Sequence, residues 1–182
     1  MADAISAFIR FKVAPEAKPI CTVSKGESRH ITYKSSDGWL ELSELGWEIT
    51  AETSFTEGGG ASVGKSAPGN FTFKHNLDMA ALPILGFIAS GSNFSEVEIH
   101  VCKSTGANQT SPYLKIWLKA AYLTKASLNV GSDGKGTQDV EAVFKSIKTE
   151  YFKQDDTGKL GSESAAFEWD VQTTKASAGQ PK

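Results

Sequence analysis

The chain has 182 residues, of which 40% are hydrophobic and 22% charged, and this composition indicates one soluble globular domain with a substantial core. The formal net charge of -2 and the dispersed basic residues exclude a surface for nucleic acid. No apolar run approaches the roughly 18 residues of a membrane helix, so we expect no membrane insertion. Two cysteines, Cys21 and Cys102, exclude a disulfide framework, and we expect both to be reduced.

The first residues, MADAISAFIRFKV, begin with an acidic residue at position 3 and carry an arginine inside the apolar run. A signal peptide has a basic start and an uninterrupted hydrophobic segment, so we expect no cleavable leader. Within this stretch, residues 5–13 place an apolar side chain at every second position. This is the period of a strand with one buried face.

The segment GWLELSELGWEIT at residues 38–50 changes its apolar register midway. We therefore expect a long bent strand or a hairpin, with a bulge or turn near residues 43–46. After a Gly-rich stretch, Phe71 and Phe73 return to strand spacing.

The segment DMAALPILGFIASG at residues 78–91 predicts one short apolar helix. Asp78 could cap its start and Gly91 could end it. With Asp78 as the cap, Pro83 falls inside the helix, so either the first turn is irregular or the regular part begins at Pro83.

Residues 94–102 alternate most regularly, with Val97, Ile99 and Val101 on one face and polar side chains on the other. Residues 113–130 keep apolar side chains in one even register from Leu114 to Val130. Helical spacing also fits part of this run, but the even register lasts longer and favours a strand.

The turn SDGKG at residues 132–136 is followed by residues 138–152, which leave the same choice between strand and helix open. A further turn precedes AFEWDV, and residues 174–182 are small and polar, which predicts a disordered tail. The sum is a mainly β fold: an antiparallel β-barrel or two-sheet sandwich with one flanking α-helix, as a single domain over residues 1–173.

The stretch from Gly59 to Ser66 matches the G-x-x-x-x-G-K-[ST] spacing of a phosphate-binding loop, with Lys65 in the lysine position. Such a loop needs a buried strand before it and a helix that begins at the lysine. Here the preceding residues lack an apolar run, and Ala-Pro-Gly-Asn follows Ser66, which breaks a helix in its first turn. We reject a nucleotide site and interpret the stretch as an exposed loop that contacts a partner protein.

The other candidate sites have simpler interpretations. His100 and Cys102 share a strand face but form no recognisable metal spacing, and no G-x-S-x-G nucleophile motif occurs. Glu96 and Glu98 fit the solvent-facing side of a sheet. The tryptophans Trp39, Trp47, Trp117 and Trp169 lie in strand-like segments, which favours core or interface packing over glycan binding. We therefore predict no catalytic residue, no metal and no cofactor.

Taken together, the order of these features resembles the Hcp (haemolysin-coregulated protein) family of bacterial type VI secretion inner-tube subunits. The resemblance rests on FIRFKV, KGES, GWLELSELGW, the Gly-rich stretch, FTFKHNLD before the helix, FSEVEIHVCKSTG, YLKIWLKAAYLTKASL, EYFKQDDTGKLG and EWDV. Each piece is unspecific alone, whereas their order and spacing along most of the chain are specific.

The resemblance implies a β-barrel-like subunit that forms homohexameric rings, which stack into a hollow tube and carry effector proteins. It also implies a spike protein and a sheath as partners, and residence in the bacterial cytoplasm followed by secretion through the apparatus. In that family an extended loop contacts neighbouring subunits and rings. By position in the pattern, this contact loop is Phe55, Thr56, Glu57, Gly58, Gly59, Gly60, Ala61, Ser62, Val63, Gly64, Lys65, Ser66, Ala67, Pro68, Gly69 and Asn70.

Three alternatives differ in what they predict. A tail-tube protein of a phage-related contractile particle would share the fold and differ in its neighbouring genes. A monomeric ligand-binding β-barrel would have a mass near 20 kDa in solution. A nucleoside triphosphatase, already rejected on its flanking sequence, would bind ATP through Lys65.

Overall fold

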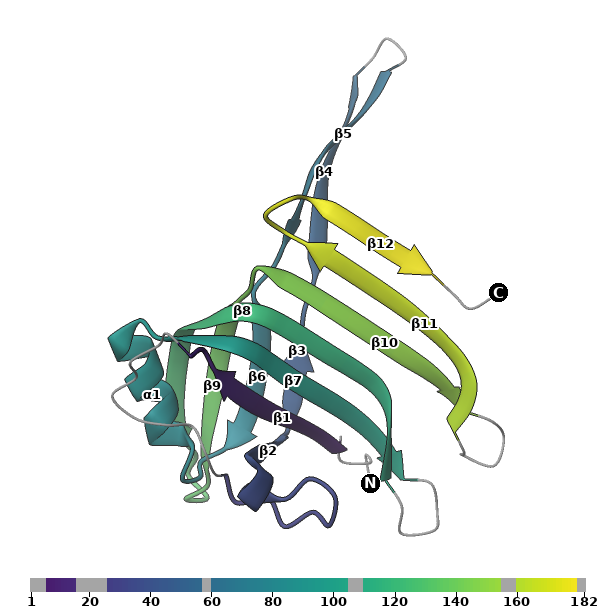
Figure 1. Ribbon diagram of the computed structural model, residues 1–182. Helices are drawn as coiled ribbons and strands as arrows, with labels where there is room; N and C mark the ends of the chain where they lie inside the picture. Colours follow the sequence, from purple (N-terminus) through teal and green to yellow (C-terminus); the bar gives the residue numbers. More distant parts are fainter. Residues whose placement is uncertain (1–5, 16–25, 57–59, 105–109, 155–159, 180–182) are drawn as a thin grey trace.

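The computed structural model describes residues 6–15, 26–56, 60–104, 110–154 and 160–179 (Figure 1). Within these residues the chain is built from antiparallel strands, one α-helix and a short 3-10 helix, as the alternation predicts. The elements are β1 (Ser6–Val13), η1 (Ser35–Asp37), β2 (Trp39–Leu42), β3 (Glu44–Gly46), β4 (Ile49–Thr56), β5 (Gly60–Pro68), β6 (Phe71–Asn76), α1 (Ala81–Ser90), β7 (Asn93–Ser104), β8 (Thr110–Val130), β9 (Gly136–Val143), β10 (Ser146–Gln154), β11 (Leu160–Asp170) and β12 (Lys175–Gly179).

The strands form a two-layer sandwich that divides at β8. One layer has the order β12-β11-β10-β8-β7-β1-β2, and the other continues from the second half of β8 through β9 and β6 to β3. Strands β4 and β5 pair only with each other and project from the body as a separate ribbon (Figure 1). The large sheet ends at β2 and β12, so it is a sandwich and is not closed as a barrel.

Strand β8 can serve both layers because its backbone reverses the alternation at Ala120. This residue has a φ of 48°, an unusual value for an alanine in a strand. Ile116 and Leu118 are buried before it, whereas Ala121 and Leu123 are buried after it. The prediction of a strand at residues 113–130 is confirmed, but the prediction of one even register through it is wrong beyond residue 120.

The core lies between the two layers and is closed on one side by α1. Phe11 of β1 contacts Phe73 of β6 across the layers, with ring centroids 6.0 Å apart. Phe87 of α1 stacks on Phe94 of β7 at 4.4 Å, and both side chains are fully buried. The apolar faces of β1 and β7 form the centre of this core, as their alternation predicts.

Helix α1 begins at Ala81, between the two predicted starting points. Asp78 is not its cap, because the cap position is Ala80, and the Asp78 carboxylate instead accepts a hydrogen bond from the Ala80 backbone N–H (2.9 Å). Pro83 then lies in the first turn, where a missing N–H removes no helical hydrogen bond. The predicted end is confirmed, since Gly91 takes a left-handed φ of 63° after Ser90.

A buried polar network holds the start of the helix against β6 and β9. The Gln138 side chain donates to the Ala81 carbonyl (3.1 Å), and its amide oxygen lies 2.7 Å from Nε2 of His75. Both side chains are fully buried. The amide oxygen can only accept, so Nε2 of His75 is the donor in this contact.

Two further segments differ from expectation. Residues 138–152 are two strands, β9 and β10, separated where the Lys145 backbone N–H donates to Lys119 and its carbonyl accepts from Val171. The tail predicted to be disordered from residue 174 is wrong for Lys175–Gly179, because this segment pairs with β11 as strand β12. Backbone pairing needs no apolar side chains, so the composition did not reveal it.

Candidate subunit interface

The segment predicted as a contact loop is mostly a β-ribbon. Phe55 and Thr56 end β4, Gly60–Pro68 is β5, and residues 57–59 lie outside the described residues. The two strands are in register from Ile49 opposite Pro68 to Thr56 opposite Gly60, with a shift between Ala51 and Thr53. The prediction of a loop without structure of its own is therefore wrong. Backbone hydrogen bonds across the ribbon replace the missing apolar alternation.

The phosphate-loop motif has the wrong backbone for nucleotide binding. Lys65 and Ser66 lie in the middle of an extended strand, and β6 follows after Gly69 and Asn70. A phosphate loop needs successive N–H groups that converge on one point and a helix N-terminus behind them. In β5 the backbone N–H groups alternate in direction, so the described geometry supports the rejection of a nucleotide site.

The base of the ribbon is anchored by aromatic packing. Trp47 links β3 to β4, and its ring lies 6.0 Å from the Phe144 ring and 6.1 Å from the Phe167 ring. Beside it, a hollow of about 320 Å³ separates the ribbon from the edge of the large sheet; it is lined by Ile49, Lys65, Ser66, Phe167, Trp169, Thr174 and Ala176. The ribbon is therefore anchored to the body at Trp47.

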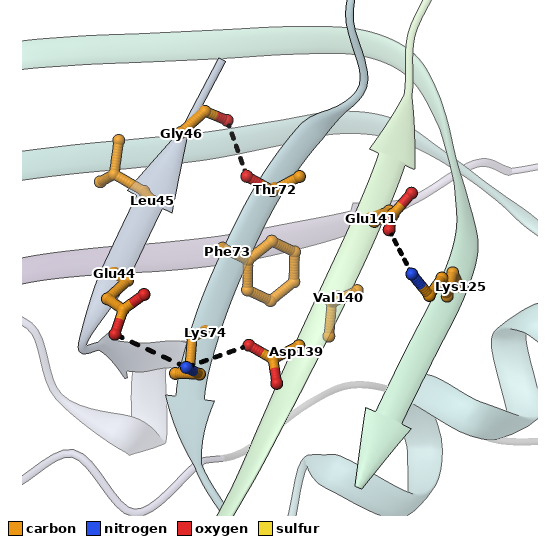
Figure 2. Close-up of a pocket in the computed structure, with 10 residues that line it drawn as sticks. All are labelled: Glu44, Leu45, Gly46, Thr72, Phe73, Lys74, Lys125, Asp139, Val140 and Glu141. Atoms are coloured by element: carbon orange, nitrogen blue, oxygen red, sulfur yellow. Dashed lines mark hydrogen bonds and ion pairs between the residues drawn. The ribbon is translucent and has the colours of Figure 1, made fainter. Parts of the chain in front are cut away.

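A second hollow, of about 290 Å³, lies on the outer face of β3, β6, β9 and the second half of β8 (Figure 2). Lys74 of β6 lies between Glu44 (3.5 Å) and Asp139 (3.3 Å). The hydrogen bond to Asp139 raises the pKa of Lys74 above its usual value. Lys125 of β8 pairs with Glu141 of β9 at 2.7 Å. Every charged side chain drawn in this hollow has an ionic partner, and Glu44 and Asp139 share Lys74, so the hollow presents a paired polar surface with an excess of one negative charge.

A third cluster of polar side chains lies on the other face of β1 and β7. Glu98 pairs with Arg10, and Glu98 Oε1 lies 3.0 Å from Nε2 of His100, in poor alignment for a hydrogen bond. The Tyr33 hydroxyl lies 3.1 Å from Nδ1 of His100, and the Cys102 thiol donates to that hydroxyl at 3.4 Å. The interpretation of Glu98 as merely solvent-facing is wrong, because its side chain is only 17% exposed and Arg10 pairs with it.

This cluster has the character of a small core and not of a reactive site. Phe8 stacks on Tyr33 at 4.2 Å, and Trp39 lies 5.1 Å from the His100 ring. Burial raises the pKa of the Cys102 thiol, so the thiolate that a nucleophile or metal ligand requires is disfavoured. Among the described residues no group of three or more His, Cys, Asp or Glu side chains could hold a metal ion. Cys21 lies outside the described residues.

Acid should destabilise the fold through His100. Burial lowers the pKa of His100 in the folded chain, whereas an unfolded histidine titrates near 6.5. Below that pH the unfolded state binds more protons, so the stabilisation present above about pH 6.5 is lost as the pH falls towards the lowered pKa. In urea unfolding at pH 7.5 and 5.5, His100→Asn should reduce the pH dependence of the unfolding free energy by at most about 1.4 kcal/mol per pH unit. Equal pH dependence in the two proteins would contradict the assignment.

Comparison with known proteins places this geometry in a family. The family described as "Type VI secretion system effector, Hcp" matches residues 19–151. This chain belongs to the Hcp family. Its members are subunits of the type VI secretion inner tube, in which hexameric rings stack, and they are secreted proteins. No curated protein matches the sequence significantly.

Solved structures share the Hcp fold over nearly the whole chain. A structure described as a type six secretion system protein has a TM-score of 0.79 at 21% identity, covering 96% of this chain and 100% of its own. Hcp1 from Salmonella typhimurium has a TM-score of 0.66 at 23% identity and covers 94% of this chain and 99% of its own. A type VI secretion system effector from Yersinia pestis has a TM-score of 0.64 at 16% identity and covers 91% of this chain and 99% of its own.

Other observations agree with a β-rich subunit of this family. In the described part of the chain, no helix is long and apolar enough to cross a membrane. Trp39 and Trp169 are buried, as the packing interpretation predicts. Trp117 is half-buried, with the Lys148 ammonium 5.7 Å from its ring centroid.

Proposed function

We propose that this Hcp-family chain acts by self-association. Its contact to neighbouring subunits and rings is the segment Phe55–Asn70, which includes the end of β4, all of β5 and the two residues after β5. The observation that supports this is the ribbon itself: it projects beyond the body and pairs with no other strand of the described chain (Figure 1). Gly64, Lys65, Ser66 and Ala67 are all exposed. Such a projecting, unpaired segment is the natural site for contact with another copy.

The proposed arrangement of the copies follows from the closure of a ring. A ribbon on one side of the subunit and a different receiving surface on the next make a head-to-tail contact, and six such contacts close into a finite ring. A lateral contact that supports a stable ring should bury at least about 1,000 Å². The net charge of -2 keeps repulsion between copies small along a stacked tube.

We propose that the chain has no catalytic role and needs no cofactor. In the hollow of Figure 2 each charged group is held in an ion pair, and near His100 the Glu98 carboxylate is paired with Arg10. Catalysis requires a titratable group that is accessible and held for reaction, and these groups are occupied in holding strands together. We propose that the single tube domain predicted for residues 1–173 continues through β12, because Lys175–Gly179 pairs with β11 in the large sheet.

The partners proposed here are those of a tube subunit: other copies, effector proteins in the lumen, the spike protein and the sheath. We propose that the chain is made in the bacterial cytoplasm and leaves through the secretion apparatus. The support is family membership.

Native mass measurement tests the proposal. Six copies of the 19.5 kDa chain come to about 117 kDa, and we expect this species to dominate at micromolar concentration. Light scattering and native mass spectrometry would both detect it. A species of about 20 kDa that persists up to millimolar concentration would refute self-association and favour a monomeric ligand-binding barrel.

A further inference from the structure

Strand β12 is held to the large sheet almost entirely by its backbone. It reads Lys-Ala-Ser-Ala-Gly from Lys175 to Gly179, and all five residues are exposed. Small side chains that remain exposed bury little apolar area, so the hydrophobic effect contributes little to its docking. Alanine, lysine and glycine are also poor strand formers. β12 is therefore the element of this sheet that is easiest to release.

The turn that leads into β12 is strained. Thr174 has a φ of 56°, in the left-handed region, where a β-branched residue is a rare exception. The turn is closed by Asp170, whose Oδ1 accepts the Thr173 backbone N–H at 2.8 Å. Release of β12 would relieve the strain at Thr174. The strained turn therefore lowers the free energy needed to release β12 from the sheet.

The edge under β12 is longer than β12 itself. β11 runs from Leu160 to Asp170, but β12 pairs only with Ala166–Asp170. On that side, residues 160–165 have no strand partner in the described part of the chain. A longer strand could therefore form more backbone hydrogen bonds with β11 than β12 does, including those that β12 now makes.

We propose that β12 is a replaceable edge strand: it covers the β11 edge in the free subunit, and a strand of the β4–β5 ribbon of a second copy takes its place when rings form. This inference rests on the proposed function and identifies the surface that receives the ribbon. β4 and β5 have eight and nine residues, against five in β12. Each has one edge without a partner among the described strands, and the ribbon projects away from its own body (Figure 1). Adding a strand to an open sheet edge is a general mode of protein recognition.

A disulfide lock tests the proposal directly. Glu168 and Ser177 are opposite each other in the β11–β12 register, and residues opposite in an antiparallel pair have a Cα separation that a disulfide can span. Glu168→Cys with Ser177→Cys, in a Cys21→Ser background, should remain monomeric when oxidised and form rings after reduction. The single variant Ser177→Cys in the same background is the control and should form rings in both conditions. Rings that form with the disulfide closed, as checked by mass, would overturn the proposal.

Two further variants act in opposite directions without a cross-link. Deletion of residues 175–182 should lower the concentration at which half the subunits are in rings. Thr174→Gly relieves the left-handed strain, stabilises the covered state and should raise that concentration by roughly fivefold. A deletion that abolishes rings while the thermal unfolding of the monomer is unchanged would overturn the proposal, because β12 would then be part of the contact.

The outcomes for the two proposals are distinguishable in these experiments. A wild-type chain that stays monomeric refutes self-association itself. A wild-type chain that forms rings, together with a lock that has no effect, leaves self-association intact and refutes only the replacement of β12.

Discussion

Shortening the β4–β5 ribbon should leave a folded subunit that no longer forms rings. Ala51 and Ser66 are opposite each other in the ribbon, so residues 52–65 can be replaced by Asn-Gly, a two-residue hairpin turn. The aromatic anchor at Trp47 and the pairs between Ile49–Thr50 and Ala67–Pro68 remain. The core lies elsewhere, so thermal unfolding should stay cooperative. Sizing and electron microscopy should show a loss of rings and stacks.

A matched control distinguishes loss of the ribbon from a general surface effect. Lys135→Ala changes an exposed residue in the turn between β8 and β9, in a different hairpin from the ribbon. It should form rings as the wild type does. Rings from the shortened chain, in the amount and size of the wild type, would show that the part of the segment from Phe55 to Lys65 is not the contact.

Phe87→Ala should cause the largest loss of stability among single substitutions in the helix. The Phe87 side chain is fully buried and stacks on Phe94 at 4.4 Å, so its removal leaves a cavity between α1 and β7. Truncation of a buried phenylalanine costs about 3–5 kcal/mol in unfolding free energy. For a chain of this length the melting temperature should fall by roughly 6–20 °C.

Leu82→Ala is the control for this substitution in the same helix. Leu82 is 68% exposed, so its truncation should change the unfolding free energy by no more than about 0.5 kcal/mol. Both variants must be compared at one protein concentration, because assembly itself stabilises the folded chain. Equal losses in the two variants would mean that the helix does not pack as described. A larger loss in Leu82→Ala, seen only where rings form, would place that face in an interface.

Much of the fold was predictable because strand alternation is a local property. Val97, Ile99 and Val101 are buried on one face of β7 as their spacing predicts, and the break near residues 43–46 separates β2 from β3. The helix ends at Ser90 because Gly91, which follows it, takes a left-handed conformation. These features depend on neighbours a few residues apart, which the sequence displays directly.

The candidate interface was only partly predictable. The segment from Phe55 to Asn70 was located by the order of motifs, but its form as a ribbon was not, because β5 has no apolar alternation and is defined by its pairing with β4. Glu98 was assigned to solvent, yet its side chain is only 17% exposed and Arg10 pairs with it, while Tyr33 packs against His100 on the same face of β7. No local pattern indicates that a distant segment will fold over a strand face.

The sequence by itself determined that the segments of β1, β6, β7 and β8 are strands, where the helix ends and that Lys65 has no helix behind it, since each follows from local periodicity and backbone chemistry. Only the tertiary structure decided that the chain reverses its alternation at Ala120, that β4 and β5 stand apart as a ribbon, and that β12 covers the β11 edge. These features arise from pairing between segments far apart in the chain or from a single unusual φ value. Backbone hydrogen bonds contribute to the long-range pairing and to the unusual φ value. Every residue type except proline can form them, so the side chains do not reveal where they occur.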